Sequence, residues 1–562
     1  MNYRKILTII TISLCLSGFL SCKVGIGDND KENTIYTDKS PADSSMGYKI
    51  LSKGKDLAGQ VSASNYIYIV DSEFDLQSGT VNVGVDSVLK FTENGSIKNG
   101  TINFNSTFLD GSVNFKNMRF DGTLLNRTVK LSWFGANPDT DSEKAAGIKN
   151  KDIIEDVFKC MGDTLIVDGF YPVSSLIKID RSINLRSPDW NEKLCTKTYE
   201  NSYEPTNGFY TIDGKGSLFT FYQYEEGGKT KTKGSINMFG IYLKGDPQRF
   251  LDATNYNTDD ITWGIFLPWG GSVAAVYNCK FEGFSQGIRA LGGYIEKFQN
   301  VTFNACEIGL YALYASDFEV FSCKFTNCLP NYDLSKIDMN KSQSAIDNGL
   351  RQIGCGFMIE GCGMVNCANN LFENNFINLI INEAAIIINV SNNDFIDPLY
   401  TDIYIYNDYQ LLRSGILSLG SADLQTYCID NVVISDNNFK RNKNALGKCV
   451  VRFANGFHAL YNHGSVEWSR VTNLIISNNT VLDSRGDAAA DEAIFEVSNL
   501  KETLSKVTCY DNDFSSSKAN YYINLWQGST GNYTFISKGN TFPSDVDETK
   551  IRNDTLGVIV CE

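Results

Sequence analysis

Two adjacent carboxylates beside two tryptophans form the first pattern in this sequence that could do chemistry. Asp259 and Asp260 are followed by Trp263 and Trp269. Cleavage of a glycosidic bond uses two carboxyl groups, of which one protonates the leaving oxygen and the other attacks the sugar or activates a water molecule. We therefore take Asp259 and Asp260 as candidate catalytic residues of a glycoside hydrolase. The alternative is a solvated turn, where aspartate is common.

Aromatic side chains gather in segments of the same kind. Sugar rings stack their C–H faces on aromatic rings, and Tyr and Trp add a polar group that can hold a sugar hydroxyl. The residues that we predict to bind a substrate are Trp263, Trp269, Tyr404, Tyr406 and Trp468. The alternative is that these rings fasten their loops to the side of the fold.

Basic residues suggest a second chemistry. Eliminative cleavage of an acidic sugar needs a base and a group that neutralises the sugar carboxylate, often a bound calcium ion. Arg351, Arg413, Lys448 and Arg452 lie near the same segments, but their spacing alone does not assemble them into one site. Calcium is the one cofactor that this chemistry suggests. The whole chain has only two histidines, which argues against a histidine-rich metal site, and we predict no metal ligands.

A repeated hexapeptide predicts the elements that must position these residues. It consists of an apolar residue, any residue, a small polar residue, Asn or a small residue, any residue and Phe. The copies are VYNCKF, FQNVTF, VFSCKF, CANNLF, VSNNDF, ISDNNF, ISNNTV and CYDNDF, with a partial copy GNTF. Their last residues are 22, 22, 47, 23, 44, 42, 33 and 28 residues apart. Most spacings are close to one or two times 22, so we predict a solenoid with one coil of short strands per period.

Stacking of these coils accounts for the repeated residue types. A single coil cannot bury its apolar side chains, so each Phe should lie on the Phe of the coil below. Cys306 and Cys328 each follow a Phe by three residues, and we predict a column of buried free thiols, with a disulfide as the alternative. The fourth position predicts a hydrogen-bonded ladder of side-chain amides, formed by Asn370, Asn393, Asn437, Asn479, Asn512 and Asn540.

Four segments interrupt the period and are predicted to be insertions that build the walls of a binding face. They are Asp246 to Gly271, Leu329 to Arg351, Pro398 to Tyr427 and Arg452 to Trp468. Every candidate catalytic and substrate-binding residue named above falls in one of them.

The chain before the repeat should close one end of the stack. Residues 65–130 contain short strand-like units separated by glycines, which predicts narrow first coils or a β cap. Ile148 to Met161 has helical spacing of apolar residues between two glycines. We predict a helix there that caps the apolar stack, as the terminal repeats of a solenoid require.

One block carries a family resemblance. WFGA (Trp133 to Ala136), a short helix and then TLIVDGFYPVSSLIKIDRSINLRS (Thr164 to Ser187) are similar to the start of pectate-lyase superfamily proteins. Together with the hexapeptides, the similarity covers roughly residues 65–545. The resemblance implies an all-β fold, a right-handed parallel β-helix, and a lyase, a hydrolase or a protein without known activity. The Gly-Asp-Gly run of the family is replaced here by residues 137–141, and the Gly-His-Gly and Arg-x-Lys blocks of polygalacturonase-like members are absent. These departures weaken the case for a specific hydrolase.

The first residues resemble a bacterial lipoprotein signal. Arg4 and Lys5 precede an apolar run from Ile6 to Leu20, which is too short for a membrane span and suits a signal peptide. We expect a signal peptide over residues 1–21, a lipid on Cys22, and a flexible tether over residues 22–47. The protein would then be anchored at the outer membrane or surface of a Gram-negative cell. The alternative is an ordinary secretory signal.

The charge of the chain limits the partners that it could bind. The 65 acidic residues outnumber the 50 basic ones, and the formal net charge of −15 disfavours nucleic acid as a partner. We predict a β cap or first coils over residues 48–130 and a β-helix domain over residues 131–562. The predicted function is that of an anchored protein that binds a polysaccharide and cleaves it as a lyase or a glycoside hydrolase. The alternative is a non-catalytic glycan-binding or adhesive surface protein.

Overall fold

The computed structural model describes residues 45–138, 149–196, 198–212, 216–247, 261–268, 274–292, 294–329, 354–382, 387–407, 429–442, 446–447, 449–455, 471–486, 493–498, 506–525, 534–552 and 560–561. The chain divides into Met1–Lys39 and Ser40–Glu562, and the described residues all belong to the second part. The expected signal peptide, Cys22 and most of the tether therefore lie outside the described residues. No helix in the described part of the chain is long and apolar enough to cross a membrane.

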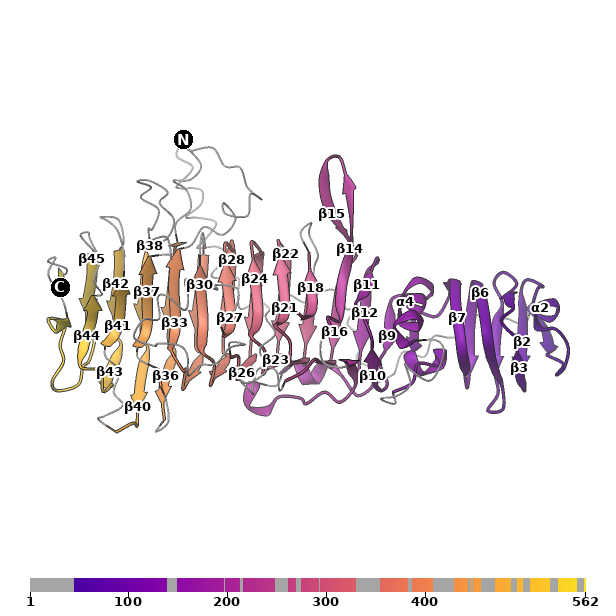
Figure 1. The fold of residues 1–562 in the computed structure, drawn as a ribbon, viewed down its shortest axis with the longest axis horizontal. Coiled ribbons are helices and arrows are strands. Elements are labelled where there is room, and N and C mark those ends of the chain that lie inside the picture. Colours follow the sequence, from indigo (N-terminus) through magenta and orange to yellow (C-terminus); the bar gives the residue numbers. More distant parts are fainter. Residues whose placement is uncertain are drawn as a thin grey trace. The chain divides into compact units, whose positions relative to one another are not determined.

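Three parallel sheets, which we call sheets I, II and III, make up most of the described chain (Figure 1). Each coil adds one strand to each sheet in turn, and each strand pairs in parallel with its equivalent in the next coil. Val276 of sheet I pairs with Phe298, and Phe281 of sheet II pairs with Phe303, 22 residues later in both cases. This topology confirms the predicted all-β, right-handed parallel β-helix.

The strands of sheet I are β8 (Thr128–Lys130), β9 (Thr164–Ile166), β12 (Ile183–Arg186), β16 (Ile236–Phe239), β19 (Ala274–Tyr277), β22 (Tyr294–Gln299), β25 (Ser316–Phe321), β28 (Met364–Ala368), β31 (Ile387–Ser391), β35 (Val432–Ser435), β39 (Leu474–Ser477), β42 (Lys506–Tyr510), β45 (Thr534–Lys538) and β47 (Val560–Cys561). Those of sheet II are β10 (Phe170–Val173), β13 (Gly208–Thr211), β17 (Tyr242–Lys244), β20 (Lys280–Glu282), β23 (Thr302–Asn304), β26 (Lys324–Thr326), β29 (Leu371–Glu373), β32 (Asp394–Ile396), β36 (Asn438–Arg441), β40 (Thr480–Asp483) and β43 (Asp513–Ser516).

The strands of sheet III are β11 (Ile177–Ile179), β14 (Phe219–Glu226), β18 (Trp263–Leu267), β21 (Gln286–Leu291), β24 (Ile308–Leu313), β27 (Cys355–Glu360), β30 (Ile377–Asn382), β33 (Thr401–Asn407), β37 (Cys449–Asn455), β41 (Ala493–Ser498), β44 (Tyr521–Leu525) and β46 (Ile551–Arg552). Strand β15 (Lys229–Lys233) pairs antiparallel with β14 and forms a hairpin that projects from the coils (Figure 1). A separate short pair joins β34 (Ile429–Asp430) to β38 (Val471–Thr472).

The hexapeptide spans the end of a sheet I strand and the start of the next sheet II strand. Its third residue turns the chain between the two sheets, and the φ angle there lies between 53° and 58° in all eight complete copies, from Asn278 to Asp511. Asn and Asp accept this left-handed conformation more readily than other non-glycine residues. The turn therefore explains why the third position is small and polar.

The predicted internal ladders are confirmed. Phenylalanine rings stack from coil to coil at centroid distances of 4.6 to 5.2 Å, in the order Phe281, Phe303, Phe325, Phe372, Phe395 and Phe439. The asparagine amides donate from Nδ2 to the Oδ1 of the next member at 2.9 to 3.0 Å, in the order Asn370, Asn393, Asn437, Asn479, Asn512 and Asn540. Cys306 and Cys328 are buried free thiols, as predicted, and no disulfide joins them.

The core also contains one carboxyl group without a hydrogen-bond partner among the described residues. Glu296 of β22 is fully buried, and neither of its carboxyl oxygens has such a partner. It precedes the inward-facing Phe298 by two residues and pairs in register with the buried Phe318 of the next coil. Burial raises the pKa of Glu296 to about 8.

A smaller parallel stack precedes the three sheets. Its strands are β1 (Gly47–Ile50), β2 (Tyr66–Val70), β3 (Glu73–Asp75), β4 (Thr80–Asn82), β5 (Val88–Phe91), β6 (Ser96–Gly111) and β7 (Phe115–Leu124), with the short helix α2 (Leu57–Gln60) after β1. Ile67 pairs with Val88, and Val88 pairs with Phe108. The units predicted over residues 65–130 are therefore parallel coils, slightly shorter than those that follow.

The predicted helix forms as α4 (Asn150–Cys160), after the short 3-10 helix η1 (Leu131–Phe134). It packs against β10 and β11 at the start of the sheets and against β7 of the smaller stack. Asp156 of α4 accepts hydrogen bonds from the Arg119 guanidinium of β7, at 3.0 Å from Nη2. The helix therefore closes the first coil of the sheets and also joins it to the smaller stack.

The segment between β12 and β13 crosses the turn between sheets I and II. It contains η2 (Glu192–Thr196) and η3 (Tyr199–Asn201). Asn278 donates to the carbonyl oxygen of Leu194 at 3.1 Å, and the Tyr199 hydroxyl donates to Asp394 at 2.6 Å. These bonds join one segment to several later coils.

Candidate functional site

The outer face of sheet III carries charged and aromatic side chains on strands that adjoin the predicted insertions. Alternation along its strands sends one row inward, including Ile288, Leu310 and Phe357. The neighbouring row points away from the interior of the coils, and in register from β18 to β41 it reads Phe266, Arg289, Tyr311, Met358, Ile380, Tyr404, Arg452 and Glu496. Phe266 and Arg289 are partly exposed, whereas the six residues from Tyr311 to Glu496 are buried.

All four predicted insertions adjoin strands of this sheet. Residues 248–260 precede β18 and residues 330–353 precede β27, while residues 408–428 follow β33 and residues 456–470 follow β37. These four segments themselves lie outside the described residues. Two of them precede and two of them follow strands of sheet III, so, of the sheets in the described part of the chain, sheet III is the one whose strands adjoin all four segments.

One arginine of this face lies between two aromatic rings. The Arg289 guanidinium is 5.6 Å from the ring centroids of both Phe266 and Tyr311. The Tyr311 hydroxyl donates to Glu360 on the next coil. Cations attract the faces of aromatic rings, and a stacked guanidinium keeps its in-plane N–H groups directed past the rings. Arg289 is only partly buried, so a ligand on this face could reach it.

A second arginine lies deeper in the same face. The Arg452 guanidinium is 5.0 Å from the ring of Tyr400 and 5.8 Å from the ring of Tyr404, and its Nη1 is 3.5 Å from Oε2 of Glu496. Both charged side chains are buried. Oε1 of Glu496 has no hydrogen-bond partner among the described residues. Burial lowers the pKa of Arg452, and the carboxylate of Glu496 partly opposes that effect.

The predicted substrate-binding residues that the structure describes lie in strands rather than in insertions. Trp263 begins β18, and Tyr404 and Tyr406 belong to β33. Trp263 is partly buried, its ring is 5.2 Å from that of Phe266, and its buried Nε1 has no partner among the described residues. Tyr404 is fully buried, while the side chain of Tyr406 is not described. The assignment to loops was wrong because the hexapeptide covers only sheets I and II, so strands of sheet III appeared as interruptions.

The other predicted site residues lie outside the described part of the chain. These are Asp259, Asp260, Trp269 and Trp468. Their roles stay predictions. No cluster of three or more His, Cys, Asp or Glu side chains that could hold a metal ion occurs among the described residues, and the suggested calcium also stays a prediction.

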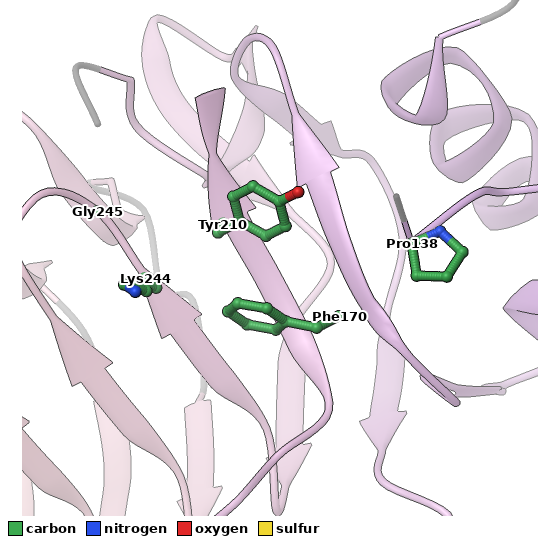
Figure 2. A pocket seen from close by; sticks show the side chains of 5 residues that line it. All are labelled: Pro138, Phe170, Tyr210, Lys244 and Gly245. Atoms are coloured by element: carbon green, nitrogen blue, oxygen red, sulfur yellow. The ribbon is translucent and has the colours of Figure 1, made fainter. Parts of the chain in front are cut away.

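A pocket on sheet II was not predicted from the sequence. It has a volume of about 360 Å³ and is lined by Pro138, Phe170, Tyr210, Lys244 and Gly245 (Figure 2). The Phe170 ring stacks on Tyr210 at 5.0 Å and on Tyr242 at 5.1 Å. The tripeptide Gly-Phe-Tyr occurs at residues 169–171 and again at 208–210, and this was the only signal of an aromatic cluster in the sequence.

The chain matches no protein-family model and no curated protein. Solved structures with a distant likeness include the surface protein and adhesin PfbA of Streptococcus pneumoniae, at 12% identity over 77% of this chain and 100% of that chain, with a TM-score of 0.41. The enzymatically active domain of tailspike protein 2 of bacteriophage CBA120 has 12% identity over 71% of this chain and 51% of its own, with a TM-score of 0.31. The family 28 exopolygalacturonase of Yersinia enterocolitica has 12% identity over 78% of both chains, with a TM-score of 0.30. Likeness at this level does not inform the activity of this chain.

Proposed function

We propose that this protein is a cell-envelope β-helix protein of the pectate-lyase superfamily that binds a polysaccharide along the outer face of sheet III. The observation that carries the proposal is the position of the four period-breaking segments, which all adjoin this sheet. At the β18–β21 end of this face, the partly exposed Arg289 is stacked between the rings of Phe266 and Tyr311. Such a surface offers ring faces for sugar C–H groups and N–H donors for hydroxyl or carboxylate oxygens.

Glycan binding by the full chain tests this proposal. We expect binding to at least one member of a glycan array of plant, algal and host polysaccharides, and a loss of about tenfold or more for Trp263→Ala and Arg289→Ala, because each removes a stacking or charge-assisted contact. Tyr222→Ala is the matched control, since Tyr222 is an aromatic residue that is 51% exposed on the β14–β15 hairpin. Equal binding by all three variants would refute the sheet III assignment.

Eliminative cleavage is a second candidate function, favoured by one observation. The partly exposed Arg289 guanidinium stacks on Tyr311, which places a cation able to neutralise a sugar carboxylate beside a residue type that can serve as a base. Release of unsaturated products absorbing at about 235 nm would identify a lyase, and new reducing ends without that absorbance would identify a hydrolase. Asp259→Asn and Asp260→Asn test the two predicted catalytic carboxylates in the same assay. Binding without products of either kind would leave the adhesive alternative.

The membrane anchor is a separate part of the proposal. Arg4, Lys5, the apolar run and Cys22 support a lipoprotein signal. We expect metabolic labelling with palmitate in the wild-type protein and none in Cys22→Ala, with the wild type in the membrane fraction. Undiminished label in the variant would refute the anchor without affecting the binding proposal.

A further inference from the structure

We propose that the pocket on sheet II is a second saccharide-binding site, distinct from sheet III, which takes a pyranose ring carrying an anionic substituent. The pocket belongs to the first coils of sheet II and is lined entirely by residues that the structure describes (Figure 2). Its volume of about 360 Å³ falls in the range of pockets that hold small molecules. This inference goes beyond the proposed function, because no residue of the pocket belongs to sheet III.

The pocket has an aromatic wall whose rings are held in place by the strand register. Phe170 on β10 and Tyr242 on β17 are two coils apart, and the residue between them in register is Gly208 on β13. Because Gly208 has no side chain, the rings of Phe170 and Tyr242 approach across it to 5.1 Å, at an interplanar angle of 20°. Tyr210 also stacks on Phe170, at an interplanar angle of 29°. A ring cluster on the outer face of a sheet, open to a pocket, suits the C–H face of a sugar.

Lys244 supplies the charge. It pairs in register with Tyr210 on the neighbouring coil and lines the same pocket. The nearest acidic position in that row, Glu282, already accepts hydrogen bonds from the Tyr242 hydroxyl and, at 2.6 Å, from Asn304 Nδ2. No ion pair involves Lys244 among the described residues, whereas Lys280 is 3.6 Å from Glu282.

The combination of these features selects the ligand class. An ammonium group that has no ion pair with any described residue and lies beside stacked rings favours a ligand with one apolar ring face and one negative group. A pyranose with a carboxylate, sulfate or phosphate has both. The surrounding chain carries a net charge of −15, so attraction of an anion here depends on this local cation rather than on the whole protein.

Calorimetric titration of the full chain with defined oligosaccharides tests the site. The probes are uronate-containing oligosaccharides, their carboxyl-reduced counterparts, and sulfated and neutral oligosaccharides of the same length. We expect Lys244→Met to weaken binding of the acidic probes by about tenfold or more and to leave neutral probes unchanged, because it removes one charge-assisted contact. Tyr210→Ala should weaken acidic and neutral probes alike. Lys324→Met, an outward-facing lysine further along sheet II, is the matched control.

The outcomes separate this site from that of sheet III. Lys244 is on the outer face, so its replacement should leave the melting temperature unchanged, and a loss of binding cannot then be attributed to unfolding. Wild-type affinity of Lys244→Met and Tyr210→Ala for every probe would overturn the pocket, whether or not Arg289→Ala loses binding. Absence of binding by the wild type to all probes would overturn it as well. Loss in the pocket variants with unchanged binding in Arg289→Ala would support the pocket and refute the sheet III proposal.

Discussion

Asn437 donates a hydrogen bond from Nδ2 to Oδ1 of Asn479, 42 residues later in the chain, at 2.9 Å. The same Oδ1 also accepts from the backbone N–H of Asn437 at 3.0 Å. Each interior member of the ladder likewise accepts two bonds at its Oδ1, from the backbone N–H and Nδ2 of the preceding member, and donates from its own Nδ2 to the next member and to a backbone carbonyl oxygen. The ladder satisfies the backbone groups that the turn between sheets I and II leaves unpaired.

Removal of one rung should therefore destabilise the stack. In Asn437→Ala, the backbone N–H of Asn393 loses its side-chain acceptor and the carbonyl oxygen of Val390 loses its side-chain donor, while Nδ2 of Asn393 keeps only its bond to the Cys367 carbonyl oxygen. Buried groups left unpaired cost about 1–3 kcal/mol each, so we expect a clear fall in melting temperature. Asn438→Ala is the matched control, because Asn438 faces outward and its side chain donates to the carboxylate of Asp394 at 3.0 Å. An equal fall in melting temperature in both variants would show that the ladder hydrogen bonds add no more stability than an outward-facing hydrogen bond.

The phenylalanine stack makes a second prediction. Phe325 lies between Phe303 at 5.0 Å and Phe372 at 4.6 Å, and it is fully buried. Phe325→Ala opens a cavity in the core and should lower the free energy of unfolding by about 3–5 kcal/mol, whereas Phe325→Leu should cost less. Denaturant titration followed by circular dichroism measures the difference. If alanine proved no worse than leucine, the contribution of packing at this position would be refuted.

Glu296 predicts a dependence of stability on pH. Burial of the carboxyl group raises its pKa to about 8 in the folded protein. Below the ordinary glutamate pKa of about 4.5, the carboxyl group is protonated in both the folded and the unfolded chain, so its ionisation does not lower the stability of the fold. As the pH rises from there towards 8, only the unfolded chain releases the proton readily, so stability declines.

Glu296→Gln should remove this decline. We expect the variant to be more stable than the wild type at pH 8 and closer to it at pH 5, as measured by thermal melts. Glu319→Gln is the control, because Glu319 lies on the next coil, partly exposed, in an ion pair with Lys297 at 3.0 Å. Parallel pH profiles for wild type and Glu296→Gln would contradict the assignment.

The buried ion pair of sheet III gives a fourth prediction. Arg452→Met leaves the buried carboxylate of Glu496 without its cation and should cost about 3–5 kcal/mol of stability. The double variant Arg452→Met/Glu496→Met should recover most of that loss, because no uncompensated charge remains. The exposed pair Lys297–Glu319 is the control and should contribute no more than about 1 kcal/mol. A double variant as unstable as the single one would show that the pair contributes more than charge compensation.

Several features followed from residue types and spacing alone. The helix before the sheets followed from its own spacing of apolar residues, whereas the 22-residue period, the stacked phenylalanines, the asparagine ladder and the free thiols are consequences of one rule. Equivalent residues of successive coils lie side by side, so any residue type that repeats along the chain also repeats in space. Phe303 and Phe325 could be placed in contact because each occupies the last position of its hexapeptide.

Sheet III was the part that sequence did not reveal. Its strands lack the hexapeptide, and the outward row from Phe266 to Glu496 has no repeated residue type that a period would detect. Trp263 and Tyr404 were therefore expected in loops, although they belong to strands. The pocket of Phe170, Tyr210 and Lys244 was missed for a related reason, since its residues come from three coils and meet only through strand register.

The sequence by itself determined the period, the internal ladders and the acidic balance, because these depend only on which residue recurs and how often. The tertiary structure decided which interruptions of the period share one sheet, and which side chains face outward together. Those properties depend on the strand register and on the direction of each side chain, which reverses from one residue to the next. A single sequence with one legible strand motif per coil does not contain that information for the other strands. Only the stacked coils place Arg289 between Phe266 and Tyr311, and Lys244 beside Tyr210.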